Sequence, residues 1–105
     1  MAPPANRREE LHEKLVAILG SRNVYFQPPE NIKMQYPAIV YERDYANTLH
    51  ADNQPYRITK RYQVTVIDGD VDSPIPDKVA LLPQCSFIRH FETNKLHHDI
   101  YNLYY

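Results

Sequence analysis

The chain has 105 residues, a formal charge of −1 and an apolar fraction of 43%. This length suits one compact domain, and the composition is that of a folded chain. The near-zero charge gives no general attraction to nucleic acid or to anionic membranes. No apolar run approaches the roughly 20 residues of a membrane span, and one cysteine excludes an internal disulfide. We expect a flexible N-terminal segment, residues 1–5, followed by a single domain, residues 6–105.

The first predicted element is an amphipathic helix. Asn6 and Glu9 have the spacing of a capping box, and Gly20 is suited to end the helix in a left-handed conformation. Apolar residues recur between them at helical spacing, at Leu11, Leu15, Ile18 and Leu19. A short β-prone piece, Val24–Gln27, follows. After a proline-rich stretch, a second strand is predicted from Ala38 to Tyr45.

The segment Asp44–Pro55, "DYANTLHADNQP", is polar and rich in turn-forming residues. It predicts a long connection between strands that protrudes from the sheet, since tight hairpin loops have about 2–5 residues. Long loops on a rigid sheet often carry function. This makes the segment a candidate assembly surface, with a flexible solvent loop as the alternative. Its candidate contact residues are Tyr45, Leu49, His50, Asp52 and Asn53.

From Tyr56 to Val66 the residues alternate strictly, which predicts an antiparallel strand with one wet face. Tyr56, Ile58, Tyr62, Val64 and Val66 share one face with Lys60. The opposite face carries Arg57, Thr59, Arg61, Gln63 and Thr65, so Arg57 and Arg61 form a candidate basic sheet face. The tyrosines that could stack on bases and the arginines that could bind phosphates then lie on opposite faces. This weakens the resemblance to proteins that bind single-stranded nucleic acid.

Ser73 and Pro74 predict the start of a short second helix with Ile75, Val79 and Leu82 on its apolar side. Two more strands, "QCSFIRHFE" and "HHDIYNLYY", follow around a "TNK" turn. The predicted order is α-β-β-β-α-β-β: an α+β fold, with an antiparallel or mixed sheet and two helices packed on one face. We expect the helices to dock through Leu11, Leu15, Ile18, Leu19, Val79 and Leu82.

The motif "DGDVDS" places Asp68, Asp70 and Asp72 at the first ligand positions of a calcium loop. Ser73 replaces the required glycine and Val79 the bidentate glutamate, so a polar turn is the better interpretation. Adjacent His97 and His98 point to opposite faces of a strand and cannot share an ion. We therefore expect no metal site and no cofactor.

Nucleophilic catalysis has no positive support in the sequence. Cys85 and His90 are five residues apart on one predicted strand, so their side chains are expected on opposite faces. Cys85 is expected to be a small buried residue beside Phe87. No Gly-x-Ser-x-Gly motif is present. We therefore expect a protein that is not an enzyme.

Four strings together resemble small proteins of the neck-and-tail gene cassette of long-tailed bacteriophages. They are "VYFQPPENIKMQYPAIVYERD", "ADNQPYRITKRYQVTVID", "SPIPDKVALLPQCSFIRHF" and "HHDIYNLYY". Within that cassette the chain is most similar to the tail terminator, or tail-completion, family. The resemblance implies a similar order of helices and strands, but the family has no catalytic motif to transfer.

The resemblance implies that the chain is a structural virion protein of the head–tail junction. Family members form hexameric rings that cap the finished tail tube and join it to the head connector. The implied partners are copies of this chain, the connector or stopper protein, the tail tube protein and genomic DNA that passes without sequence-specific binding. Assembly would take place in the host cytoplasm, and no membrane partner is implied. The alternatives are a head-closure (stopper) protein, and a small nucleic-acid-binding module that uses Arg57, Lys60 and Arg61.

Overall fold

The computed structural model describes residues 7–51 and 54–105, and for residues 47–51 and 54–59 it describes the backbone alone. The predictions for the segment 1–5 and for Asn6 as a helix cap lie outside these residues. The described elements are α1 (Arg7–Leu19), β1 (Val24–Phe26), β2 (Ala38–Ala51), β3 (Gln54–Asp68), α2 (Ile75–Ala80), β4 (Cys85–Thr93) and β5 (Leu96–Tyr104). The predicted α+β order is confirmed.

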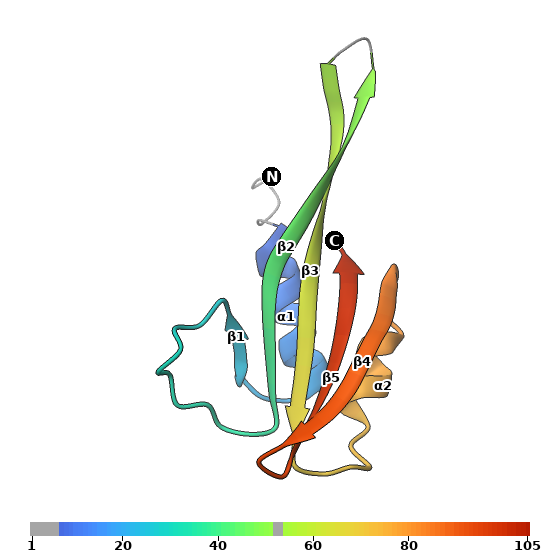
Figure 1. The fold of residues 1–105 in the computed structure, drawn as a ribbon. Helices are drawn as coiled ribbons and strands as arrows, with labels where there is room; N and C mark the ends of the chain where they lie inside the picture. Colours follow the sequence, from blue (N-terminus) through green and yellow to red (C-terminus); the bar gives the residue numbers. More distant parts are fainter. Residues whose placement is uncertain (1–6, 52–53) are drawn as a thin grey trace.

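The five strands form one mixed sheet in the order β1-β2-β3-β5-β4 (Figure 1). β1 runs parallel to β2, and every other neighbouring pair is antiparallel. The final strand, β5, therefore lies inside the sheet between β3 and β4. The edge on that side of the sheet is β4, which the tight β4–β5 hairpin places outside β5.

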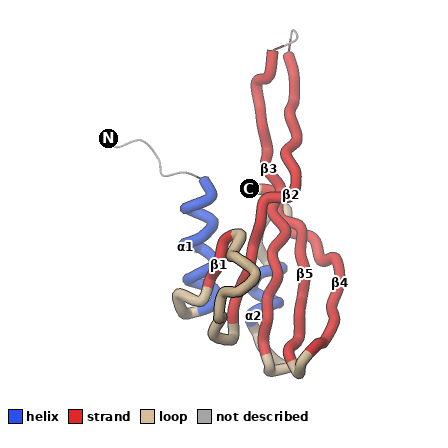
Figure 2. Tube along the Cα trace, turned by 60° about the vertical axis from the view of Figure 1, so that its left-hand side comes forward, coloured by secondary structure: helices blue, strands red, loops and turns tan. Residues whose placement is uncertain are grey.

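Both helices lie on the same side of the sheet (Figures 1 and 2). Alternate residues of the central strands point to that side and are buried against the helices, in agreement with the predicted alternation of β3. Leu11 and Leu15 of α1 are completely buried, as is Val79 of α2. Ile18 and Leu82 are only partly buried, but both pack against the same core. The strand residues of this core are Val24, Ile39, Tyr41, Tyr62, Val64, Val66, Tyr101 and Leu103.

The ends of the helices follow local chemistry. Gly20 has φ +82°, the left-handed conformation expected after a helix, and its N–H donates to the carbonyl of Val16 at 2.8 Å. The predicted start of α2 is shifted by one residue. Pro74, not Ser73, is the N-cap, and it makes no side-chain cap hydrogen bond. Ser73 still accepts a hydrogen bond from the N–H of Ile75, at 3.3 Å.

The prediction of a long loop over Asp44–Pro55 is wrong. β2 continues to Ala51 and β3 begins at Gln54, two residues before the predicted start, so only residues 52–53 separate the two strands. The ribbon protrudes from the body as expected, but it is a paired hairpin with a register shift between Leu49 and His50. Along its β2 half, residues 46–51 place both polar and apolar residues on each face, so the apolar alternation of a half-buried strand is absent there.

A β-bulge in β4 overturns a second prediction. The register shifts between Phe87 and Arg89, so Cys85 lies opposite Leu103 and His90 lies opposite Asp99. Leu103 and Asp99 are four residues apart on β5 and share a face. Cys85 and His90 therefore lie on the same face of the sheet, because the extra residue of a bulge reverses the alternation beyond it.

Candidate assembly surfaces

The most distinctive surface is the distal part of the β2–β3 hairpin, residues 45–51 and 54–60, which we call the hairpin arm. Its strands pair with each other from Ala46 opposite Lys60 to Ala51 opposite Gln54. On β3, the pairing with β5 ends at Arg61, and on β2 the pairing with β1 ends at Tyr41. The arm thus projects as a two-stranded ribbon (Figure 2), and the molecule measures 52 × 32 × 28 Å.

The base of the arm is held by a cluster of three side chains. Asp44 occupies a bulge in β2, between Arg43 and Tyr45. Arg61 donates to both carboxylate oxygens of Asp44, at 3.1 and 3.3 Å. The same guanidinium lies 5.0 Å from the ring centre of Tyr45, which is a cation–π distance. These contacts link the two strands of the hairpin at the base of the arm.

The structure brings together two of the residues predicted for assembly or phosphate binding, Tyr45 and Arg61. Tyr45 remains 48% exposed. Arg61 is paired with Asp44, so the predicted basic sheet face loses one of its two charges to an ion pair. Leu49, His50 and Arg57 lie on the strands of the arm, and the structure gives only their backbone. Asp52 and Asn53 lie outside the described residues.

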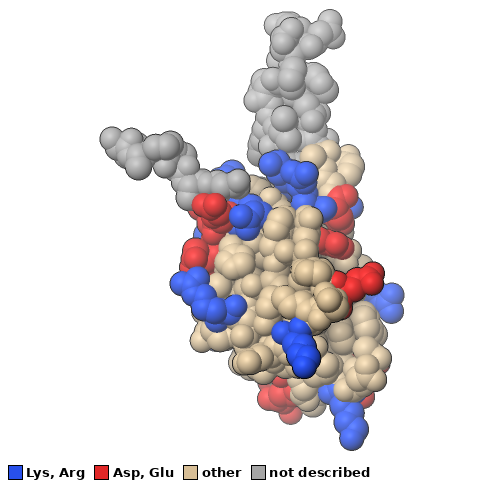
Figure 3. Space-filling model, turned by 90° about the vertical axis from the view of Figure 1, so that its left-hand side faces the viewer, with Lys and Arg blue, Asp and Glu red and all other residues tan. Residues whose placement is uncertain are grey.

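Sequence reasoning missed a basic depression at the base of the arm. Arg8, Arg43 and Lys60 line it together with Phe26, Gln27 and Tyr62. The guanidinium of Arg8 lies 4.8 Å from the ring centre of Phe26 and also donates to Tyr41 Oη at 3.3 Å. These cations come from three elements, α1, β2 and β3, that are distant in the sequence. The sequence therefore contained one signal of the depression, which was the charged Lys60 on the apolar face of its strand. Figure 3 shows positive side chains near the base of the arm with negative ones beside them.

The other candidate surface is the outer edge of β4. No strand covers this edge within the part of the chain that the structure describes. Two large apolar side chains near the bulge remain accessible: Phe87 is 58% exposed and Ile88 is 44% exposed. Natural edge strands are usually protected by charge, bulges or a covering segment. The bulge offers some protection here, and the exposed apolar pair makes this edge a candidate contact surface.

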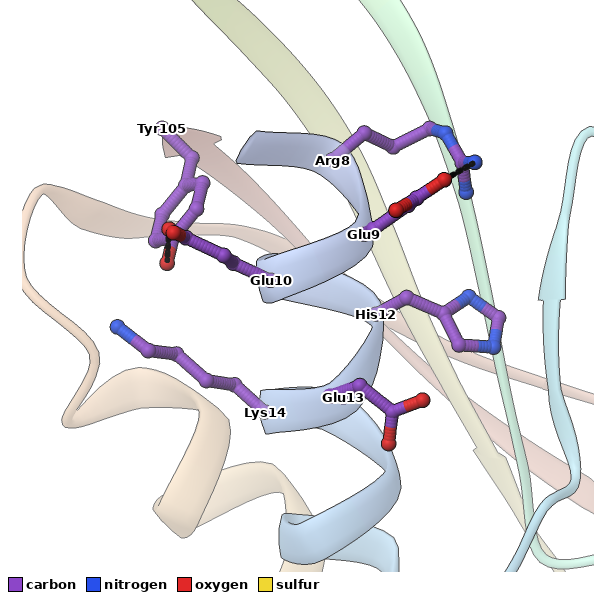
Figure 4. Close-up of a pocket in the computed structure, with 7 residues that line it drawn as sticks. All are labelled: Arg8, Glu9, Glu10, His12, Glu13, Lys14 and Tyr105. Atoms are coloured by element: carbon purple, nitrogen blue, oxygen red, sulfur yellow. Dashed lines mark hydrogen bonds and ion pairs between the residues drawn. The ribbon is translucent and has the colours of Figure 1, made fainter. Parts of the chain in front are cut away.

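The outer side of α1 carries a shallow hollow lined by charged side chains from successive turns (Figure 4). The side chains diverge to either flank of the helix: Glu10, Lys14 and Tyr105 lie on one side and His12 and Glu13 on the other (Figure 4). Tyr105 Oη donates to Glu10 at 3.2 Å. Burial and the nearby charge of Arg8 lower the pKa of His12, whose Nδ1 lies 2.7 Å from Tyr41 Oη. The hydrogen bond to Glu10 therefore holds Tyr105 against α1. The side chains that line the hollow do not converge on one point, so they form no set of reactive groups.

The aspartates of "DGDVDS" form the predicted polar turn. The N–H of Asp70 donates to Asp68 Oδ1, and the N–H of Asp72 donates to Asp70 Oδ1, both at 2.9 Å. Cys85 is half-buried rather than buried, and its burial raises the pKa of the thiol, which disfavours the reactive thiolate. Among residues 7–51 and 54–105, no three His, Cys, Asp or Glu side chains are grouped to hold a metal ion.

The sequence matches no protein-family profile, and a search of curated proteins finds no match. No helix in the described part of the chain is long and apolar enough to span a membrane. What the geometry defines is an α+β protein with a projecting two-stranded arm and an open sheet edge.

Proposed function

We propose that this protein is a structural component of a bacteriophage head–tail junction, a tail terminator whose copies form a ring. The hairpin arm is the observation that carries the proposal. A two-stranded hairpin by itself is at best marginally stable in water, and stability normally requires a third strand or a packed face. Beyond Asp44 and Lys60, no third strand pairs with the arm within the described residues. A partner that packs against the arm would provide it.

The arm is long enough to reach a neighbouring subunit. Ala51 lies six residues beyond Tyr45 along β2, a distance of about 20 Å at roughly 3.3 Å per residue. Ring assembly needs a heterologous contact, in which two different surfaces of the same protein meet. The arm, which extends β2 and β3, and the accessible edge of β4 are two such surfaces. This arrangement supports a head-to-tail ring.

Trimming the arm tests the proposal directly. Removal of residues 48–58, with Asn47 joined to Thr59 through an Asn-Gly turn, keeps the body and its core. We expect the trimmed protein to fold but to remain a monomer under conditions in which the intact chain forms rings, as measured by light scattering. It should also fail to support infectious tailed particles. Normal titre with the trimmed protein would show that the arm has no role in assembly.

A fractionation experiment separates the terminator from a stopper. A terminator belongs to the end of the tail tube, whereas a stopper belongs to the DNA-filled head. When heads and tails are prevented from joining, the protein should sediment with free tails. Its presence on filled heads and absence from tails would replace our proposal with the head-closure alternative.

The basic depression supports a second candidate function, contact with nucleic-acid phosphates. Arg8, Arg43 and Lys60 line it beside two aromatic rings, a combination found in proteins that bind single strands. If it binds, the affinity should fall steeply with salt, and Arg43→Ala together with Lys60→Ala should reduce the slope of that dependence by about one unit per lost contact. Lys33→Ala, an exposed cation outside the depression, is the matched control. Equal affinity of the double variant would eliminate this function.

A further inference from the structure

Two histidines and two carboxylates form a compact quartet near the turn between β4 and β5, at the end of the sheet opposite the hairpin arm (Figure 1). His90 lies directly opposite Asp99, and Glu92 lies directly opposite His97. All four share one face of the sheet, because residues two apart on a strand point the same way. The bulge after Phe87 is what brings His90 to this face.

The side chains make a continuous chain of contacts. His90 Nδ1 lies 2.8 Å from Asp99 Oδ1, and His97 Nε2 lies 3.4 Å from Glu92 Oε2. The remaining nitrogens, His90 Nε2 and His97 Nδ1, face each other at 3.4 Å. The two ring centres are 5.4 Å apart, farther than these nitrogens. The rings therefore diverge from the point where their inner nitrogens meet.

The flanking carboxylates favour one tautomer for each ring. A carboxylate only accepts hydrogen bonds, so Asp99 favours the proton on His90 Nδ1, and Glu92 favours the proton on His97 Nε2. Two neutral imidazoles held in this way direct two unprotonated nitrogens toward the same gap. In this arrangement both unprotonated nitrogens can bind one cation placed in the gap.

We propose that His90 Nε2 and His97 Nδ1 bind a divalent transition-metal ion of the kind that imidazole prefers, such as Ni²⁺ or Zn²⁺. Two nitrogens at about 2.0–2.1 Å from a tetrahedral ion lie about 3.3–3.4 Å apart, which matches the observed separation. Histidine ligands characteristically donate their other N–H to a carboxylate; Asp99 lies at hydrogen-bond distance from His90 Nδ1, and Glu92 lies 3.4 Å from His97 Nε2. Water completes the coordination.

The surroundings suit an entering cation. The side chain of His90 is 43% exposed and that of His97 is 16% exposed, so the gap is reached from solvent while one ligand stays fixed. Asp68 of β3 lies opposite His97 on its other side, adding a third carboxylate to this end of the sheet. The bound ion would join the edge strand β4 to β5, and its binding free energy would then stabilise the folded edge.

The test uses the full chain without a histidine tag, titrated calorimetrically with Ni²⁺ or Zn²⁺ at neutral pH. We expect one ion per chain, no comparable uptake of Mg²⁺, and a rise in the melting temperature with saturating Ni²⁺. His90→Ala and His97→Ala should each weaken Ni²⁺ binding at least tenfold. Asp99→Asn, which retains the shape of the carboxylate, should weaken it 10–100-fold.

His98→Ala is the matched control, since His98 stacks on Phe91 with ring centres 4.5 Å apart, on the other face of the same strand. It should leave the affinity unchanged. If the single variants fold poorly, nuclear magnetic resonance of the histidine side chains in the wild-type protein provides the test. Only the imidazole resonances of His90 and His97 should shift when Zn²⁺ is added. Shifts spread equally over all five histidines, or a response to pH but none to metal, would overturn the proposal.

Discussion

Replacing Leu15 with alanine tests whether α1 docks on the sheet as described. Leu15 has no exposed surface and lies in the middle of the core between α1 and the sheet. The substitution removes three buried carbons, at about 0.8 kcal/mol each, and leaves a cavity that the surrounding side chains only partly fill. Together these effects should lower the free energy of unfolding by about 2–5 kcal/mol. For a domain of this size, the melting temperature should fall by about 10 °C or more.

The matched control is Leu81→Ala, the same chemical change at a side chain that is 84% exposed. It should alter the free energy of unfolding by less than about 0.5 kcal/mol. Urea unfolding followed by far-ultraviolet circular dichroism is suitable, because the chain has no tryptophan for fluorescence. The two variants should share the dependence on urea of the wild-type protein and differ in midpoint. Equal midpoints for Leu15→Ala and Leu81→Ala would refute the docking of α1.

Three further predictions concern single side chains. Burial, followed by the charge of Asp99, raises the pKa of Tyr101 to about 12. The wild type should therefore lose stability from about pH 10 to 12, where the unfolded chain ionises first. In alkaline urea titrations Tyr101→Phe should show a smaller loss, with the remainder due to Tyr41, whose pKa burial also raises. The pKa of His12 is lowered in the folded state, so the folded chain resists protonation at this side chain. The stability that His12 contributes should be present above pH 6.5 and disappear as the pH falls through its folded pKa. A wild-type acid titration no steeper than that of His12→Gln would contradict this. Gly20→Ala should lower the free energy of unfolding by about 1–2 kcal/mol through the positive φ alone, since no atom lies within 4 Å of the added carbon. Gly20→Asn should lower it by less. Equal thermal stability of the wild type and both variants would show that this helix end relaxes freely.

Part of the hairpin arm could be inferred from sequence, but its form could not. The polar composition of Asp44–Pro55 indicated that the segment leaves the core, and the structure has it protruding. The same composition favoured a loop, because a strand without a buried face has no apolar alternation to reveal it. The ribbon is determined by pairing between the two strands, which supplies their backbone hydrogen bonds.

The candidate sites show the same division between local and long-range information. The turn over Asp68, Asp70 and Asp72 was predictable, since each aspartate bonds an N–H two residues ahead. The pairing of Arg61 with Asp44 depends on a bulge in β2, and sequence periodicity contains no signal for a single inserted residue.

The sequence by itself determined the order of elements and most of the core, because helical spacing at Leu11 and Leu15 and strand alternation from Tyr62 to Val66 are properties of short segments. The tertiary structure alone decided which surfaces come together. Strand β5 lies inside the sheet and β4 at its edge, a matter of pairing between distant segments. The contact between His90 and His97 arises from the register of β4 and β5 after a bulge. Neither register nor bulge is specified by local propensity, since both are set by packing against the rest of the fold.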